Sequence, residues 1–340
     1  MRNDSRSGEA TTTFRARSVA AAFVFLLLGG AGAACPGAGA SEALSDWVRS
    51  KPHPKEIGSA AKTAVDLAAL EAEVKTLIEG GTPGDPPSSG YRLTRLPEES
   101  VWIYEDPSHL EPSLIVNTGP RLDLVIQAPH AGLESGTPLQ AAYLLRRTGA
   151  RAVLLSGMHR CASKVFSDCD GKTSVCGERE PYRTSDAAHH VGGAFQKIHE
   201  VLAAAWPGSV ILQLHEMRPF EKGKLVILSS TARELERDDA LVGGLKAAMN
   251  RRLEPKIRAV SCHDPKDLEL GFRLLCGYTN VQGRQINGSA QPCSESAPLS
   301  KERFVHVEQD FHITSDPWYL EQLAASILEA GEGRLELARE

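Results

Sequence analysis

The chain has 340 residues, which is long enough for one large hydrophobic core, and it carries a formal net charge of −5. Hydrophobic residues make up 41% and charged residues 24% of the chain, as in an ordinary globular protein. The acidic balance argues against nucleic acid as a partner and against attachment to anionic lipid by charge alone.

The first 34 residues predict export. Basic residues precede an uncharged run whose apolar centre is residues 19–28, and small residues follow it. This order is typical of a secretory signal, and the apolar part is short for a membrane span, so we expect cleavage rather than a retained anchor. Because residues 1–34 contain four basic and two acidic residues, the mature protein in the periplasm or cell envelope would carry a formal charge of −7.

The seven cysteines agree with an oxidising compartment. Cys35 directly follows the small residues, at the place where a bacterial lipoprotein carries its lipid, so it offers a membrane attachment. The other six lie in two clusters, residues 161–176 and 262–293, and disulfides require an even number. We predict that these six form disulfides, whose pairing the sequence does not reveal. A cysteine-rich metal site is the alternative, and no C-x-x-C pair supports it.

Residues 35–90 predict a tether that contains one amphipathic helix, residues 59–79, and a Gly/Pro-rich linker after it. Strand-like runs and helical stretches then alternate in a domain spanning residues 91–335. We expect strands near 101–104, 113–117, 122–128, 151–156, 209–215, 224–229, 257–261 and 303–308, and helices near 136–148, 186–205, 236–253 and 315–330.

Several of these strands are continuously apolar, as in a sheet that is covered on both faces. The predicted fold class is therefore α/β, with a mostly parallel or mixed central sheet sandwiched by helices. Ligands of such sheets bind beyond the carboxyl ends of the strands.

Two motifs place candidate metal ligands at that edge. His130 and Glu134 lie in the sequence A-P-H-A-G-L-E-S-G-T, which turns sharply after an apolar strand, and His215 ends the next strand of this kind. Imidazole and carboxylate suit zinc, and a catalytic zinc takes three protein ligands and keeps one position open. We predict zinc at His130, Glu134 and His215. The alternatives are buried histidines that bond carbonyl groups and a glutamate that favours a helix N-terminus.

A third motif supplies a carboxylate. The sequence F-V-H-V-E-Q-D-F-H, residues 304–312, places its histidines and acidic residues on one face of a strand. A carboxylate there can take a proton from the attacking water and deliver it to the leaving amine. Glu308 is the candidate, because Val305 and Val307 indicate an interior strand; an edge strand with a polar outer face is the alternative.

Together, the Pro-His-x-Gly turn, the Leu-His strand end and the late glutamate resemble the zinc carboxypeptidase-like superfamily. The closer resemblance is to its N-formylglutamate amidohydrolase and poly-γ-glutamate hydrolase branches, and it covers roughly residues 100–330. It implies His130, Glu134 and His215 as zinc ligands and Glu308 as the acid/base. The poly-γ-glutamate hydrolase pattern A-P-H-G-G-G-I-E-x-G-T has one more residue between the histidine and the glutamate.

The glutamyl-type substrates of these branches imply a carboxylate clamp, because a guanidinium fork fits a carboxylate. Arg160, Arg183 and Arg218 are the candidates, with an ordinary surface role as the alternative. Asp186 reads as a helix cap, and the two histidines at 189 and 190 as structural or exposed residues.

The sequence thus predicts an exported zinc-dependent amidohydrolase that cleaves an amide or isopeptide bond of a glutamate-like or peptide substrate bearing a carboxylate. A non-catalytic envelope protein that retains the fold for binding is the alternative. Glu308 distinguishes the two, since a binding protein needs no carboxylate beside the metal. A serine hydrolase is disfavoured because no G-x-S-x-G motif occurs.

Overall fold

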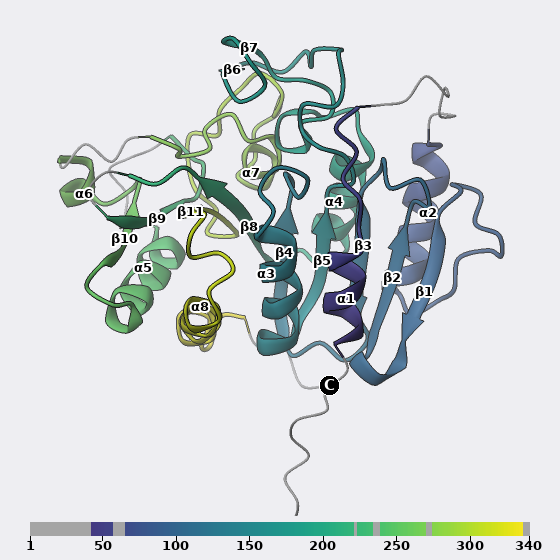
Figure 1. Cartoon of the computed structure of the whole chain (residues 1–340), viewed down its shortest axis with the longest axis horizontal. Coiled ribbons are helices and arrows are strands. Elements are labelled where there is room, and N and C mark those ends of the chain that lie inside the picture. The colour runs from purple at the N-terminus through teal and green to yellow at the C-terminus, as the bar shows by residue number, and fades with distance from the viewer. Residues whose placement is uncertain (1–41, 57–64, 221–222, 234–238, 270–273, 336–340) are drawn as a thin grey trace, which may run out of the picture. The chain divides into compact units, whose positions relative to one another are not determined.

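A nine-stranded mixed β-sheet with helices on both faces organises the chain (Figure 1). The computed structural model describes residues 42–56, 65–220, 223–233, 239–269 and 274–335, which belong to a single unit, Ala40–Glu340. The predicted signal peptide and Cys35 lie outside these residues. None of the helices within these residues combines the length and the apolar character that a membrane span requires.

The sheet has the strand order β1-β2-β3-β5-β4-β8-β11-β9-β10, and a separate two-stranded sheet pairs β6 with β7. The strands are β1 Arg92–Leu96, β2 Val101–Glu105, β3 Ser113–Asn117, β4 Leu122–Ala128, β5 Ala150–Leu155, β6 Lys172–Thr173, β7 Glu180–Pro181, β8 Val210–Met217, β9 Lys224–Ser229, β10 Ile257–Ser261 and β11 Phe304–Asp310. The central strands β5, β4, β8 and β11 are parallel, and antiparallel β3 and β9 flank them. The carboxyl ends of β4, β8 and β11 therefore share one edge.

The helices are α1 Ala43–Arg49, α2 Leu67–Ile78, α3 Thr137–Leu144, α4 Ala194–Ala205, α5 Ala240–Arg252, α6 Pro265–Glu269, α7 Val281–Ile286 and α8 Pro317–Ala330. Helices α1, α3, α5 and α8 cover one face of the sheet, and α2, α4 and α7 cover the other (Figure 1). The apolar run of β4 is continuous because both faces of the strand are buried. Leu124 and Ile126 pack in the core between the sheet and α1, α3, α5 and α8 (the first core), and Val125 packs in the core between the sheet and α2, α4 and α7 (the second core).

The predicted fold class is confirmed, and every predicted strand is present with ends shifted by two residues or fewer. Four predicted helices differ. The helix expected over residues 236–253 begins at Ala240, after the capping side chain of Asp239. The helix expected over residues 186–205 begins only at Ala194, because residues 187–189 form a 3₁₀ turn and residue 190 is extended. The helix expected over residues 136–148 becomes π-helical after Leu144. The helix expected over residues 59–79 is described from Leu67, after the capping side chain of Asp66.

The segment interpreted as a tether contains helix α1, which buries Leu44 and Val48 in the first core. Seven residues with two apolar anchors give too short a periodic pattern for the helix to be recognised. The chain then crosses to the carboxyl edge of the sheet, where Pro54 O accepts a hydrogen bond from His159 N at 3.0 Å. This N-terminal segment therefore packs against the loops that form the site.

Candidate metal centre

Three side chains meet at the carboxyl edge of the sheet. His130 and Glu134 lie on the turn after β4, and His215 lies on β8. His130 Nδ1 is 2.7 Å from Glu134 Oε1 and 3.2 Å from His215 Nδ1, and His215 Nδ1 is 3.3 Å from Glu134 Oε2. All three side chains are buried, and they form a group that can hold a metal ion. The structure thus brings together the residues that the sequence predicts as ligands.

The turn after β4 is tight because neighbouring loops leave no space beside it. The backbone N–H groups of Leu133 and Glu134 both donate to His130 O. A Cβ atom on Gly132 would lie 2.8 Å from His53 Cβ and 2.9 Å from His159 Cα. Glycine therefore allows the close packing that turns His130 and Glu134 toward one point.

The tautomer of His130 follows from its partner behind the turn. His130 Nε2 is 2.9 Å from Asp186 Oδ1, while the other oxygen of Asp186 accepts two hydrogen bonds from Arg160. Burial alone would raise the pKa of Asp186, but Arg160 and the neighbouring histidines hold it well below its usual range. An ionised carboxylate only accepts, so Nε2 carries the hydrogen and a neutral His130 presents the lone pair of Nδ1.

The tautomer of His215 is set by a glutamine network under the sheet edge. Gln213 Nε2 donates to the side-chain oxygens of Gln127 and Gln282, at 3.0 and 3.2 Å. Gln213 Oε1 therefore faces His215 Nε2 at 2.9 Å and accepts its hydrogen. His215 also presents the lone pair of Nδ1 to the shared point.

Two lone pairs and a carboxylate facing one another require a cation between them. Without a metal, a proton on His130 can act as this cation. Burial and Arg160 lower the pKa of His130, but Glu134 and Asp186 have the larger effect and raise this pKa to about 8. Burial and His306 lower the pKa of His215 to about 3. Tetrahedral zinc with bonds of about 2.0–2.1 Å holds its ligand atoms about 3.3 Å apart. The separations of 3.2 and 3.3 Å that involve His215 fit such an ion, whereas the 2.7 Å between His130 Nδ1 and Glu134 Oε1 would have to widen.

The candidate acid/base lies beside this point. Glu308 on β11 is opposite His215 in the parallel register with β8, so both side chains project from the same face. It is 8% exposed, and its Oε1 is 3.2 Å from His306 Nε2. Burial raises the pKa of Glu308, and His306 lowers it to a smaller extent.

The three candidate arginines occupy different places. Arg160 is buried, and its Nη1 is 3.3 Å from His130 Nδ1 and 3.6 Å from Glu134 Oε1. Arg183 bonds Glu180 and two backbone carbonyls, and Arg218 is exposed just after β8. Only Arg160 lies at the candidate ligands among these three.

A second group, His130, Asp186 and His189, is also close enough for a metal ion. Here both histidines approach the same oxygen, since His189 Nδ1 is 2.8 Å from Asp186 Oδ1. The guanidinium of Arg160 already neutralises this carboxylate, so a second cation is disfavoured there. We assign this group to orienting His130 and Arg160.

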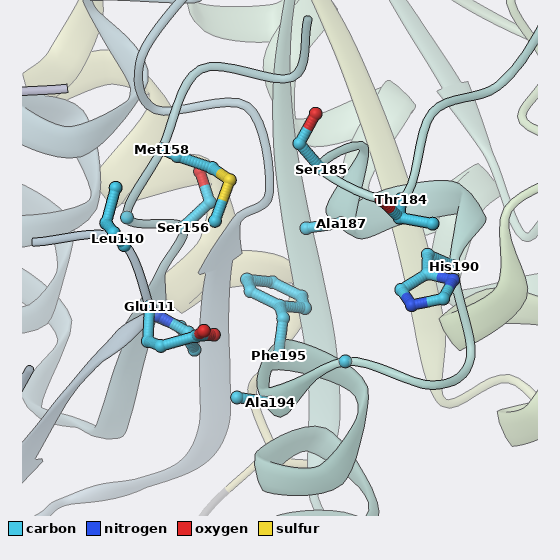
Figure 2. A pocket seen from close by; sticks show the side chains of 13 residues that line it. Leu110, Glu111, Ser156, Met158, Thr184, Ser185, Ala187, His190, Ala194 and Phe195 are labelled. Carbon is cyan, nitrogen blue, oxygen red and sulfur yellow. The ribbon is translucent and has the colours of Figure 1, made fainter. Parts of the chain in front are cut away.

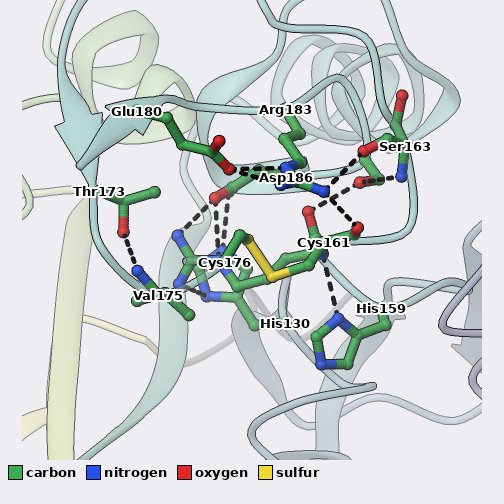
Figure 3. The surroundings of a disulfide bond; sticks show 12 residues. His130, His159, Cys161, Ser163, Thr173, Val175, Cys176, Glu180, Arg183 and Asp186 are labelled. Atoms are coloured by element: carbon green, nitrogen blue, oxygen red, sulfur yellow. Dashed lines mark hydrogen bonds and ion pairs between the residues drawn. A yellow bond between two sulfur atoms is a disulfide. The ribbon is translucent and has the colours of Figure 1, made fainter. Parts of the chain in front are cut away.

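Three disulfides confirm the predicted oxidation of the six cysteines: Cys161–Cys176, Cys169–Cys293 and Cys262–Cys276. One of them joins the two sequence clusters. Cys161 directly follows Arg160 in the chain, and His130 and Asp186 lie in the surroundings of the Cys161–Cys176 disulfide (Figure 3). Disulfides of this kind are typical of proteins from extracellular or periplasmic compartments.

A pocket of about 50 Å³ shares two loops with the site. Ser156, whose hydroxyl accepts from Ala131 N, forms part of one wall, and Ser185, next to Asp186, forms part of another. The ring of Phe195 lies between His190 and Glu111 in this pocket (Figure 2). The pocket therefore adjoins the loops that carry His130 and its partner.

No protein-family model matches the chain, and no curated protein sequence matches it. Similar solved structures include the gene product Atu2144 from Agrobacterium tumefaciens, with 12% identity over 66% of this chain and 95% of that chain and a TM-score of 0.38. A candidate metallopeptidase from Shewanella amazonensis SB2B has 12% identity over 79% and 92% of the two chains and a TM-score of 0.32. A candidate carboxypeptidase A from Shewanella denitrificans OS-217 has 9% identity over 66% and 62% and a TM-score of 0.34.

These identities and TM-scores carry no conclusion about activity, so the class of the protein follows from its own geometry. The fold and the site define an α/β protein whose sheet edge holds a buried His–Glu–His group able to bind a metal ion.

Sequence reasoning missed the residues that orient this group. The sequence predicts a helix cap at Asp186, but its side chain caps no helix and instead bonds His130, Arg160 and His189. The spacing of Asp186 and His189, three residues apart, was the available signal. The role of Gln213 was hidden within a strand that otherwise reads as apolar.

Proposed function

We propose that the protein is an exported zinc-dependent amidohydrolase that cleaves an amide or isopeptide bond of a glutamate-like or peptide substrate. The observation that supports this best is the convergence of His130 Nδ1, His215 Nδ1 and the Glu134 carboxylate, with both histidine tautomers fixed by buried partners. The histidine and carboxylate set suits zinc, although other divalent ions accept the same donors.

A zinc ion bound there would supply Lewis acidity toward a carbonyl oxygen and make water a better nucleophile. Glu308 would take the proton of the attacking water and deliver it to the leaving amine. Its raised pKa suits this task, because a carboxyl group that exchanges protons best has a pKa closer to the working pH. Arg160 Nη1 would donate to the oxyanion that develops, while its other nitrogens remain bonded to Asp186.

We assign recognition of a substrate carboxylate first to Arg218. It is exposed just after β8, whereas the guanidinium of Arg183 is occupied by Glu180 and two carbonyl groups. The expected substrates are N-acylglutamates, poly-γ-glutamate or peptidoglycan stem peptides. Arg218→Ala should raise KM for the preferred one more than it lowers kcat, since a clamp remote from the reacting bond contributes to binding.

Metal content tests the ligand assignment. His130→Ala, purified alongside the wild type, should hold little zinc by elemental analysis, because one of three ligands is lost. His312→Ala is the matched control, since that side chain is 51% exposed and pairs with Asp310. Equal zinc in the His130 variant and the wild type would show the assignment to be wrong.

A substrate screen separates the enzyme from the binding-protein alternative. The wild type should release amine product from one of the three substrate classes, and Glu308→Gln should retain zinc but lose activity. Zinc binding without turnover of any substrate, or full activity in Glu308→Gln, would favour the non-catalytic alternative or another acid/base.

Export and lipid attachment at Cys35 also remain proposals. Mass spectrometry of the protein purified from the cell envelope should find a mature N-terminus at residue 35. A diacylglyceryl mass on Cys35 would establish the lipid anchor, and a free thiol would exclude it.

A further inference from the structure

A buried histidine beside the acid/base candidate has no part in the reaction proposed above. His306 is 3% exposed on β11 and lies opposite Gln213, just as Glu308 lies opposite His215. The ring of His306 packs against the ring of His215, with centroids 4.3 Å apart. It therefore contacts a candidate ligand and the acid/base at the same time.

The two ring nitrogens of His306 differ in their hydrogen bonding. Nε2 is 3.2 Å from Glu308 Oε1, whereas Nδ1 is buried and has no hydrogen-bond partner within the described part of the chain. A buried nitrogen without a partner is destabilising, and a glutamine or an apolar residue at this position would avoid it. The stability of the fold alone does not account for the imidazole.

The ring is also held in place. Gly277, at φ +64°, packs against its Nδ1 edge, and a Cβ atom there would lie 3.1 Å from His306 Cγ and Nδ1. The ring of His215 lies on its other side. Backbone and ring together keep Nε2 directed at the carboxylate of Glu308.

We propose that His306 is a positioning residue that holds Glu308 Oε1 through its Nε2–H and leaves Oε2 for proton transfer. This inference deepens the proposed amidohydrolase function and rests on it. Among the described residues, the imidazole is the only side chain that bonds the Glu308 carboxylate. Without it, the glutamate would gain rotamer freedom, and loss of alignment by a fraction of an ångström lowers the rate of proton transfer.

Two variants separate positioning from packing. His306→Leu removes the donor at similar volume, and His306→Gln keeps an N–H donor with similar reach. Both should hold as much metal as the wild type. His306→Leu should lower kcat about 10- to 100-fold with little change in KM, and His306→Gln should recover most of that loss. In a Glu308→Gln background, His306→Leu should have no further effect, because its action passes through Glu308.

A second readout does not depend on activity. In the Co²⁺-loaded protein, a released Glu308 can approach the ion, so His306→Leu should shift the visible absorption bands while His306→Gln leaves them unchanged. Glu308→Gln should abolish the difference. Equal effects of both His306 variants on kcat and spectrum, or no effect of either, would overturn the positioning role. A wild type that binds neither Zn²⁺ nor Co²⁺ would overturn the amidohydrolase itself; unshifted Co²⁺ bands in His306→Leu would overturn only this inference.

Discussion

Replacing Asp186 by asparagine tests whether this carboxylate orients the candidate ligand His130 through its Nε2. Asp186 is 1% exposed and bonds His130 Nε2 at 2.9 Å, His189 Nδ1 at 2.8 Å and the guanidinium of Arg160. Asparagine keeps the size but loses the charge, and its NH₂ group must face one of these donors. The variant therefore either loses the acceptor that fixes the tautomer of His130 or turns an NH₂ group toward Arg160, and in both cases it removes the negative charge behind His130.

Two magnitudes follow from this arrangement. Loss of the partner that orients a metal-binding histidine lowers affinity about 10- to 100-fold, which corresponds to about 1.4–2.7 kcal/mol. Arg160 would also remain buried without its counter-charge, and breaking a buried pair costs about 3–5 kcal/mol of unfolding free energy. The amide oxygen still accepts one hydrogen bond, so we expect the lower end of this range.

Competition with a chromophoric chelator measures the metal affinity, and urea unfolding of the metal-free protein measures the stability. Asp267→Asn is the matched control, because Asp267 is also 1% exposed and pairs with Lys246 and Arg258 away from the site. It should lose stability without losing metal affinity. A Kd for Asp186→Asn within about twofold of the wild-type value, far short of the expected 10- to 100-fold loss of affinity, would refute the reasoning.

Three further predictions follow. Gly132→Ala should lower both metal affinity and melting temperature because the new methyl group meets two loops, whereas Gly119→Ala, with open space around it, should change neither. Replacing Cys169 and Cys293 by alanine should cost up to about 5 kcal/mol in urea unfolding, because the bridge joins residues 124 apart; a loss below about 1 kcal/mol would contradict this. Burial lowers the pKa of His199 to about 3, so the folded state disfavours its protonation, and this residue should lower the wild-type stability as the pH drops below about 6.5, by up to about 1.4 kcal/mol per unit. His199→Met should flatten this dependence, and an unchanged slope would show that other groups cause it.

The sequence predicts best what local patterns determine. The central strands carry apolar runs that the sheet buries on both faces, so their positions are readable. His130 and Glu134 follow β4, His215 lies near the end of β8, and the parallel order of these two strands brings them to one edge. Glu308 was predictable for the same reason, because β11 pairs in parallel with β8.

The partners of these residues were not predictable, because tertiary packing selects them. Asp186 lies in a long connection between β5 and α4, and nothing in its neighbourhood indicates that it folds back to His130. The same holds for Gln213, whose orientation depends on two other glutamines from distant parts of the chain. A single amide in an apolar strand gives no signal until its neighbours are known.

The environment of Glu308 bears most directly on the choice between an enzyme and a binding protein. A carboxylate loses hydration when it is buried, and Glu308 keeps only one hydrogen bond from a side chain among the described residues, that of His306. An apolar residue in place of Glu308 would stabilise the fold more. The same holds for His306, because its buried Nδ1 has no hydrogen-bond partner among the described residues. Neither side chain is needed to hold an ion, since His130, Glu134 and His215 already form the group that can do so. Glu308 and His306 thus both lower the stability of the fold, and both lie on one strand beside the candidate ligands. Such destabilising polar residues are typical of active sites, so they favour the hydrolase over a protein that only binds.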